Sequence, residues 1–165
     1  KDVAANINQN GILQAVNLAN DTLRLAGKKI PMIAVAALNP HAGDNGKFGR
    51  EEIDILEPAI AKAQANKIDV TGPWPSDTIF LKAKRGEVDA VVTMYHDQGQ
   101  IAIKLLGFER GVTLAGGLPI PVATPAHGTA FDITGMNKAN VSATRQAFDL
   151  LVSMANIHRT ERDTT

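Results

Sequence analysis

Residues 32–41 read MIAVAALNPH and decide the fold class, because a short, wholly apolar run ends abruptly in a polar turn. Such a run is typical of a parallel strand that is covered on both faces. A second, largely apolar run, residues 88–94, leads directly into Tyr95-His96-Asp97. Both runs therefore predict buried strands of an α/β protein, and a histidine follows each strand at its carboxyl end.

Helical and strand-like patterns alternate on either side of these two runs. Apolar residues at three- and four-residue steps predict helices at residues 12–25, 50–63, 79–85, 101–106 and 141–157. Shorter strands are expected at residues 68–70 and 112–115, a stiff turn at 72–75, and a long loop or loop–helix element at 123–140. Ala26-Gly27 is a typical end for the first helix, and residues 76–78 can cap the third. The alternation predicts a three-layer α/β/α architecture.

Bulk composition excludes several classes of function. The chain has 165 residues, 17 Lys and Arg, 17 Asp and Glu, and no cysteine. The balanced charge gives no reason to expect a nucleic acid or an anionic membrane as partner. Without cysteine there are no disulfides and no thiolate zinc sites. No apolar run approaches the roughly 20 residues that cross a bilayer, and the first residues lack the order of a secretory signal. We expect a cytoplasmic protein.

The first residue, Lys1, is not a methionine, and the sequence opens on what resembles the first turn of a helix. We therefore expect that the chain starts inside a longer protein. In that case residues upstream of Lys1 can complete any site that this chain contains.

His41 and His96 follow the two buried strands, and the carboxyl edge of such a sheet is where α/β proteins bind ligands. Neutral imidazole is a strong ligand for zinc and similar ions, so the pair predicts a divalent-metal site. The alternative for each ring is a simple hydrogen bond to a nearby carbonyl. Asp97 or Asp77 can orient a ligating ring from its far nitrogen. Alternatively, Asp97 and Gln98 satisfy backbone donors of their own loop.

Two further features have both a functional and a structural interpretation. The glycine-rich segment 43–49 either cradles an anion or is a flexible connection, and it lacks the P-loop pattern because Phe48 follows Lys47. Lys104 is either a solvated charge or, given its apolar neighbours, a cation that requires an anionic partner.

Four motifs in order give the chain a specific resemblance. LNPHAG at residues 38–43, GPWPSDT at 72–78, MYHDQG at 94–99 and HGTAFDI at 127–133 resemble the 4-hydroxythreonine-4-phosphate dehydrogenase family of pyridoxal phosphate biosynthesis. The similarity covers nearly all 165 residues and corresponds to the carboxy-terminal half of that family. Residues 127–140 are also similar to the dinucleotide loop of isopropylmalate and isocitrate dehydrogenases.

The resemblance implies the fold of those dehydrogenases, with two α/β/α domains, an active site between them and a homodimer. Residues 1–107 would be the central metal, substrate and dimerisation domain, and residues 108–165 a returning segment of the cofactor domain, whose remainder is absent. The implied reaction is oxidation of a secondary alcohol next to a carboxylate by NAD or NADP, followed by decarboxylation. A zinc or magnesium ion would lower the pKa of the alcohol and then polarise the new carbonyl.

The resemblance also assigns residues. His41 and His96 correspond to two of three family metal ligands, with the third expected upstream of Lys1 and the set shared between subunits. Asp77, Asp97 and Lys104 correspond to catalytic positions, and Lys104 also to a position that binds an anionic substrate. Cofactor-binding positions, near the adenosine part, are His127, Gly128, Asp132 and Asn140.

At two positions this chain departs from the family pattern, and both positions concern the substrate. Members that use a phosphorylated substrate have asparagine and arginine where this chain has Thr113 and Val122. Losing two charge-assisted contacts of about 1.5–3 kcal/mol each would weaken phosphate binding by about two to four orders of magnitude. We therefore expect a non-phosphorylated substrate, such as the carboxylated cis-dihydrodiol of the terephthalate dihydrodiol dehydrogenases. The alternatives are 4-hydroxythreonine-4-phosphate dehydrogenase itself and a non-catalytic metal- or anion-binding fragment or paralogue.

Overall fold

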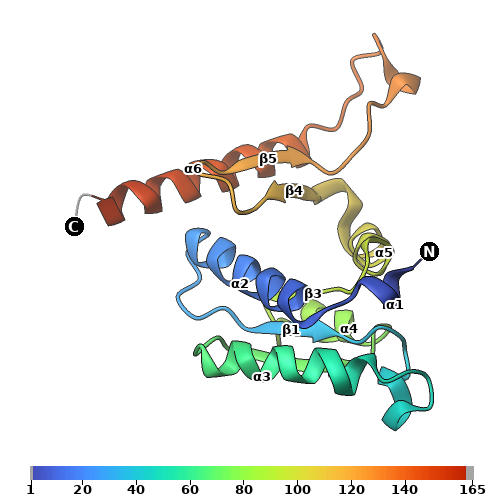
Figure 1. Cartoon of the computed structure of the whole chain (residues 1–165). Coiled ribbons are helices and arrows are strands. Elements are labelled where there is room, and N and C mark those ends of the chain that lie inside the picture. Colours follow the sequence, from blue (N-terminus) through green and yellow to red (C-terminus); the bar gives the residue numbers. More distant parts are fainter. Residues whose placement is uncertain (1, 163–165) are drawn as a thin grey trace. The chain divides into compact units, whose positions relative to one another are not determined.

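The computed structural model describes residues 2–162. The chain divides into two compact units, one made of Lys1–Arg24 and Lys28–Ala102 and the other of Leu25–Gly27 and Ile103–Thr165. Figure 1 labels the elements along the chain. The roles expected for residues 1–107 and 108–165 stay predictions.

The first unit contains a parallel three-stranded sheet with strand order β2-β1-β3. Its strands are β1 (Ile33–Ala36), β2 (Val70–Trp74) and β3 (Ala90–Val92). Every residue of β1 is buried, which the apolar run at its position predicted. Each strand is shorter than, or displaced from, its expected range, and the expected turn at 72–75 lies largely within β2. The α/β fold class is confirmed.

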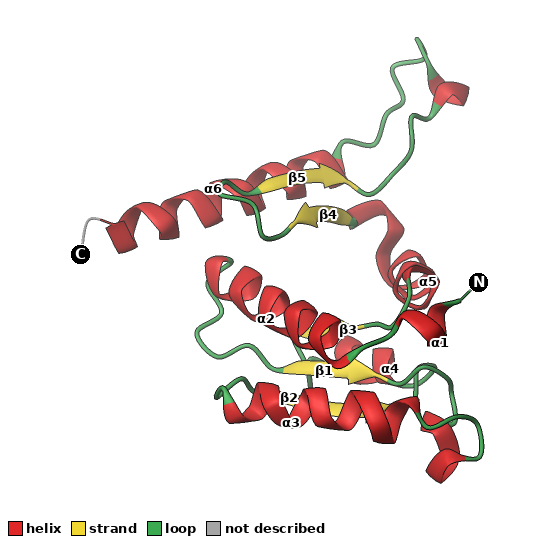
Figure 2. Cartoon of the chain, viewed as in Figure 1, coloured by secondary structure: helices red, strands yellow, loops and turns green. Residues whose placement is uncertain are grey.

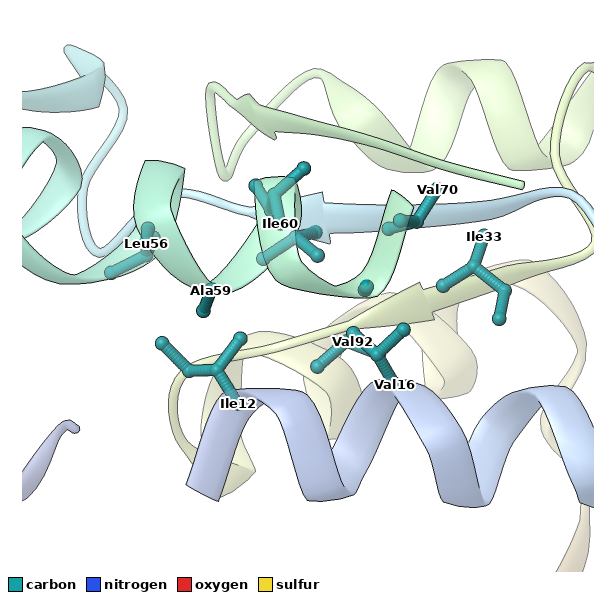
Figure 3. Packing of buried hydrophobic residues seen from close by; sticks show 10 residues of the cluster. Ile12, Val16, Ile33, Leu56, Ala59, Ile60, Val70 and Val92 are labelled. Carbon is teal, nitrogen blue, oxygen red and sulfur yellow. The ribbon is translucent and has the colours of Figure 1, made fainter. Parts of the chain in front are cut away.

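Helices cover both faces of this sheet. The short helix α1 (Val3–Asn6) precedes α2 (Gln9–Leu25), and α3 (Glu57–Ala65) joins β1 to β2. Figure 3 shows Ile12 and Val16 of α2 and Ile60 of α3 converging in one buried cluster, which also contains alternate residues of β1. On the opposite face, Ile79 of α4 (Ile79–Lys84) packs against the remaining residues of β1. The more specific likeness to isocitrate dehydrogenase stays a prediction.

A π-helical turn, η2 (Glu52–Leu56), precedes α3, and the sequence explains it. Pro58 stands in the first turn of α3 and has no N–H to donate to the carbonyl of Asp54, as a regular helix would require. Gln9 Nε2 donates to that carbonyl instead, at 3.2 Å. The wide turn therefore fits a proline at this position, and it joins the start of α2 to the start of α3.

The second unit has a two-stranded antiparallel hairpin and one long helix (Figure 2). After α5 (His96–Gly107) and the turn η3 (Phe108–Arg110), strands β4 (Val112–Ala115) and β5 (Val122–Pro125) pair along their length. A short turn, η4 (Phe131–Ile133), precedes α6 (Ser142–Arg162), which contacts both strands. Ala143, Ala147 and Met154 are its buried stripe.

Two expectations were wrong in detail. Residues 123–125 belong to strand β5, not to a loop or loop–helix element, because the antiparallel partner β4 supplies the pairing that the short segment VATP does not signal alone. Helix α5 begins at His96, five residues before its expected start, because its polar first turn carries no apolar periodicity. By contrast, the end of α2 is as predicted: Gly27 has φ 97° and Lys28 N–H donates to Leu23 O at 2.9 Å.

Across residues 2–162, no helix is long and apolar enough to cross a bilayer.

Asp89 forms two contacts at the amino ends of strands β1 and β3. Its carboxylate accepts Met32 N–H at 2.9 Å and lies 2.6 Å from Lys28 Nζ, with only 12% of the side chain exposed. The Lys28 ammonium, and then the Met32 N–H, hold the pKa of Asp89 below its ordinary value. Because the folded-state pKa is lowered, the stabilisation is present above the ordinary aspartate pKa and is lost as the pH falls through the lowered one.

We expect Asp89→Asn to lower the free energy of unfolding by about 1 kcal/mol near neutral pH. The difference from the unsubstituted protein should shrink as the pH falls below the ordinary aspartate pKa and the carboxylate becomes protonated. Urea unfolding at neutral pH and across that acidic range measures it. Asp69→Asn, at the exposed position preceding β2, is the matched control. A difference that stays constant with pH would contradict this role.

Candidate metal and cofactor site

Three loops leave the carboxyl ends of the parallel strands and carry most of the predicted metal-site residues. The loop after β1 contains His41, the turn after β2 contains Asp77, and β3 leads into His96 and Asp97 at the start of α5. Because all three strands are parallel, these loops share one edge of the sheet. The expected placement at that edge is confirmed, while the metal role of the residues stays a prediction.

The turn after β1 holds His41 at the surface. Asn39 Oδ1 accepts the backbone N–H of His41 at 3.0 Å and that of Gly43 at 3.3 Å. The imidazole stacks on the ring of Phe48, with centroids 4.5 Å apart and an interplanar angle of 18°. His41 is exposed, so it is not a packing histidine among aliphatic side chains.

His96 and Asp97 form a pair in the first turn of α5. Asp97 Oδ1 lies 2.9 Å from His96 Nδ1, and both side chains are largely exposed. A carboxylate on Nδ1 leaves Nε2 as the nitrogen that is available to a ligand. This is the arrangement expected of Asp97, whereas Asp77 is exposed in its turn and has no such contact with a histidine among the described residues.

The donor set fits part of a metal site. Two exposed imidazoles at one sheet edge suit zinc-like ions, and the Asp97 contact fixes one ring. Within residues 2–162, however, His, Cys, Asp and Glu side chains form no group of three or more that is placed to hold a metal. The expectation of a metal ligand from outside this chain stays a prediction.

Two side chains that sequence reasoning did not place in the site connect these loops. Gln98 Nε2 donates to Ala37 O at 3.0 Å and to Leu38 O at 3.2 Å, while its Oε1 accepts Met94 N–H at 2.9 Å. The alternative that Gln98 satisfies a backbone donor of its own loop is confirmed for Met94 N–H, whereas its contacts with Ala37 O and Leu38 O were not expected. Glu52 is 1% exposed and accepts Leu38 N–H at 2.9 Å. Sequence reasoning could not detect this contact, because it depends on how close Glu52 lies to the His41 turn in the folded chain.

Lys104 lies on α5 in the segment assigned to the second unit. It is exposed, its neighbours Ile101 and Leu105 are 61% and 82% exposed, and among the described residues it has no ion pair. Its role in substrate binding stays a prediction.

Thr113 and Val122 lie on one face of the hairpin. Thr113 pairs with Thr124 and Val122 with Ala115, and directly paired residues of an antiparallel ladder share a face. All four are exposed, whereas the alternate residues are partly buried. The structure thus brings the two predicted substrate positions to one open face, which carries no arginine.

The segment expected to bind the nucleotide forms a pocket of about 420 Å³. Of the predicted cofactor residues, His127 and Gly128 line it, together with Asn137 and Lys138. Asp132 and Asn140 are not among its lining residues. Asn140 instead accepts Ser142 N–H at 2.9 Å, the capping contact that begins α6.

Comparison with known proteins gives close relatives over almost the whole chain. A 4-hydroxythreonine-4-phosphate dehydrogenase from Beijerinckia indica subsp. indica is 53% identical over 137 residues, 83% of this chain and 41% of that protein. The D-threonate 4-phosphate dehydrogenase of Salmonella typhimurium is 49% identical over 140 residues, 85% of this chain and 43% of that protein. The chain therefore spans less than half the length of these relatives.

Solved protein structures are also similar to this chain. The 4-hydroxythreonine-4-phosphate dehydrogenase of Klebsiella pneumoniae matches with TM-score 0.80 and 44% identity, over 93% of this chain and 46% of that one. A terephthalate 1,2-cis-dihydrodiol dehydrogenase from Burkholderia xenovorans matches with TM-score 0.72 and 33% identity, over 92% and 48%. Residues 1–151 match the family model described as pyridoxal phosphate biosynthetic protein PdxA. This chain belongs to the PdxA family.

Proposed function

We propose that the chain is part of a dehydrogenase that depends on a divalent metal and on NAD or NADP, and that oxidises a phosphorylated hydroxy acid at a secondary alcohol, with decarboxylation. The observation that carries the proposal is the placement of His41 and the His96–Asp97 pair at one sheet edge in a member of this family. The relatives above are named for 4-hydroxythreonine 4-phosphate and D-threonate 4-phosphate.

In the proposed reaction each side chain has a task that its chemistry suits. Bound at this site, a divalent cation would supply a Lewis acid for the substrate hydroxyl, and a nicotinamide would supply the hydride acceptor. His41 and His96 would hold the cation, and Asp97 keeps the His96 ring in the orientation that presents Nε2. Lys104, exposed and without an ion pair among the described residues, would neutralise an anionic substrate group. His127 and Gly128 would contact the nucleotide from the pocket that they line.

There are two candidates for the substrate, one phosphorylated and one not. Thr113 and Val122 led us to expect a substrate without phosphate, but the relatives above named for phosphorylated substrates are 49–53% identical. The terephthalate dihydrodiol dehydrogenase is 33% identical. The phosphorylated substrate is therefore the better supported candidate. The hairpin face without an arginine is the observation that keeps a carboxylated dihydrodiol as the second.

We further propose that the enzyme is a homodimer and that its third metal ligand lies upstream of Lys1. The segment that this chain matches is less than half of each relative above, so a further ligand can come from outside it.

A direct assay tests the proposal. The full-length enzyme is incubated with NAD or NADP, zinc or magnesium, and a panel of 4-hydroxythreonine 4-phosphate, D-threonate 4-phosphate and terephthalate dihydrodiol. Appearance of the reduced nucleotide with a phosphorylated compound supports the first candidate, and with the dihydrodiol alone the second. No reduction with any hydroxy acid or dihydrodiol would favour a non-catalytic binding protein.

A further inference from the structure

The peptide backbone at Leu38 is held from two sides just before the turn that carries His41. Its N–H donates to Glu52 Oε1 at 2.9 Å, and its carbonyl accepts from Gln98 Nε2 at 3.2 Å. Glu52 belongs to the π turn before α3, and Gln98 to the first turn of α5. Elements far apart in sequence therefore meet at one residue beyond β1.

Gln98 also joins the two segments that carry the imidazoles. Its amide nitrogen donates to Ala37 O and Leu38 O, three to four residues before His41, while its amide oxygen accepts Met94 N–H, two residues before His96. A side-chain amide is suited to this position because it both donates and accepts. An aliphatic side chain of similar size would leave three backbone groups without this partner.

The turn after Leu38 has a conformation that needs support. Ala42, Asp44 and Asn45 have φ of 47°, 41° and 54°, which residues other than glycine rarely adopt. Gly43 has φ 74°, and a Cβ there would come within 2.7 Å of Glu52 Oε2. The buried Glu52 carboxylate thus fills the space beneath the turn, and surrounding contacts must offset the backbone strain.

We propose that Gln98 is a positioning residue that fixes the His41 segment against the His96 segment, with Glu52 supporting the same peptide from the other side. The inference rests on the proposed function, because it assigns this connection to the imidazole pair of that site. It adds that the relative placement of the two rings depends on an amide whose hydrogen bonds are to the backbone of both segments.

The test compares Gln98→Leu with Gln100→Leu in the full-length enzyme. Gln100 lies on the same helix, and its side chain has no hydrogen bond among the described residues. Amide hydrogen exchange, followed by mass spectrometry, should accelerate at residues 37–43 by about tenfold in Gln98→Leu. Zinc affinity, from competition with a chelator, should fall by about tenfold, near the lower bound for groups that orient a ligand. Gln100→Leu should change neither.

Gln98→Glu tests the donor and the acceptor of the amide separately. It keeps an acceptor for Met94 N–H but replaces the donors to Ala37 O and Leu38 O by oxygens, so exchange at 37–43 should rise while Met94 stays protected. It also replaces Gln98→Leu in the comparison if that variant does not fold. Saturating zinc should restore most of kcat in both variants, because the residue contacts no reacting atom.

The outcomes distinguish this inference from the proposed function. Exchange and zinc affinity equal to those of Gln100→Leu would overturn the positioning role. A wild-type enzyme that retains zinc and loses it in Gln98→Leu, yet reduces no nucleotide with any substrate, would overturn the dehydrogenase proposal and leave the positioning role supported.

Discussion

Replacing His96 with alanine in the full-length enzyme is expected to abolish metal retention and turnover together. The variant removes a nitrogen donor at the carboxyl edge of the sheet, and Asp97 Oδ1 loses the ring nitrogen 2.9 Å away. Zinc affinity should fall by more than about 100-fold, since removing even a group that merely orients a ligand costs 10–100-fold. Turnover should fall by about three orders of magnitude or more, because a Lewis acid supplies several kcal/mol and each 1.36 kcal/mol is tenfold in rate.

The control is a second exposed histidine. His127→Ala removes a ring that lines the pocket at residues 127–139. We expect it to retain zinc and to raise the KM for the nucleotide. Metal content by elemental analysis, together with steady-state kinetics, measures both variants. If His96→Ala keeps zinc and turnover near the wild-type values, His96 is not a ligand.

The sequence predicted the sheet edge well because parallel strands concentrate the signal. A strand that is buried on both faces must be apolar throughout, so residues 33–36 stand out, and the polar residues that follow must leave the sheet at its carboxyl end. His41 and His96 could therefore be assigned to one edge without coordinates. The end of α2 at Gly27 was equally predictable, because the chain there needs a positive φ.

The connections between these loops could not be predicted, because they are long-range contacts of single side chains. Nothing in the local pattern distinguishes the buried Glu52 from the half-exposed Glu51 beside it. Gln98 contacts Ala37 and Leu38, about sixty residues earlier, and only the folded chain brings them together. Strand β5 was missed for a related reason, because its pairing with β4 gives it its conformation.

Val122→Arg is expected to shift substrate preference towards phosphorylated compounds. Val122 is 40% exposed and shares a hairpin face with Thr113, so an arginine there would stand in the open without displacing a packed side chain. One new charge-assisted contact to a phosphate is worth about 1.5–3 kcal/mol. The ratio of kcat/KM for a phosphorylated substrate to that for a dicarboxylate diol should therefore rise by about 10- to 150-fold in the full-length enzyme.

The matched control for this prediction is Thr124→Arg, which places the same charge on the same strand and face, two residues further along. A bidentate contact depends on position, whereas a general attraction between a cation and an anionic substrate does not. We expect Thr124→Arg to change the ratio by less than about threefold and to lose that change at higher salt. Equal shifts in both variants would show that net charge, and not position 122, selects the substrate. An unchanged ratio in Val122→Arg would show that this hairpin face does not meet the phosphate.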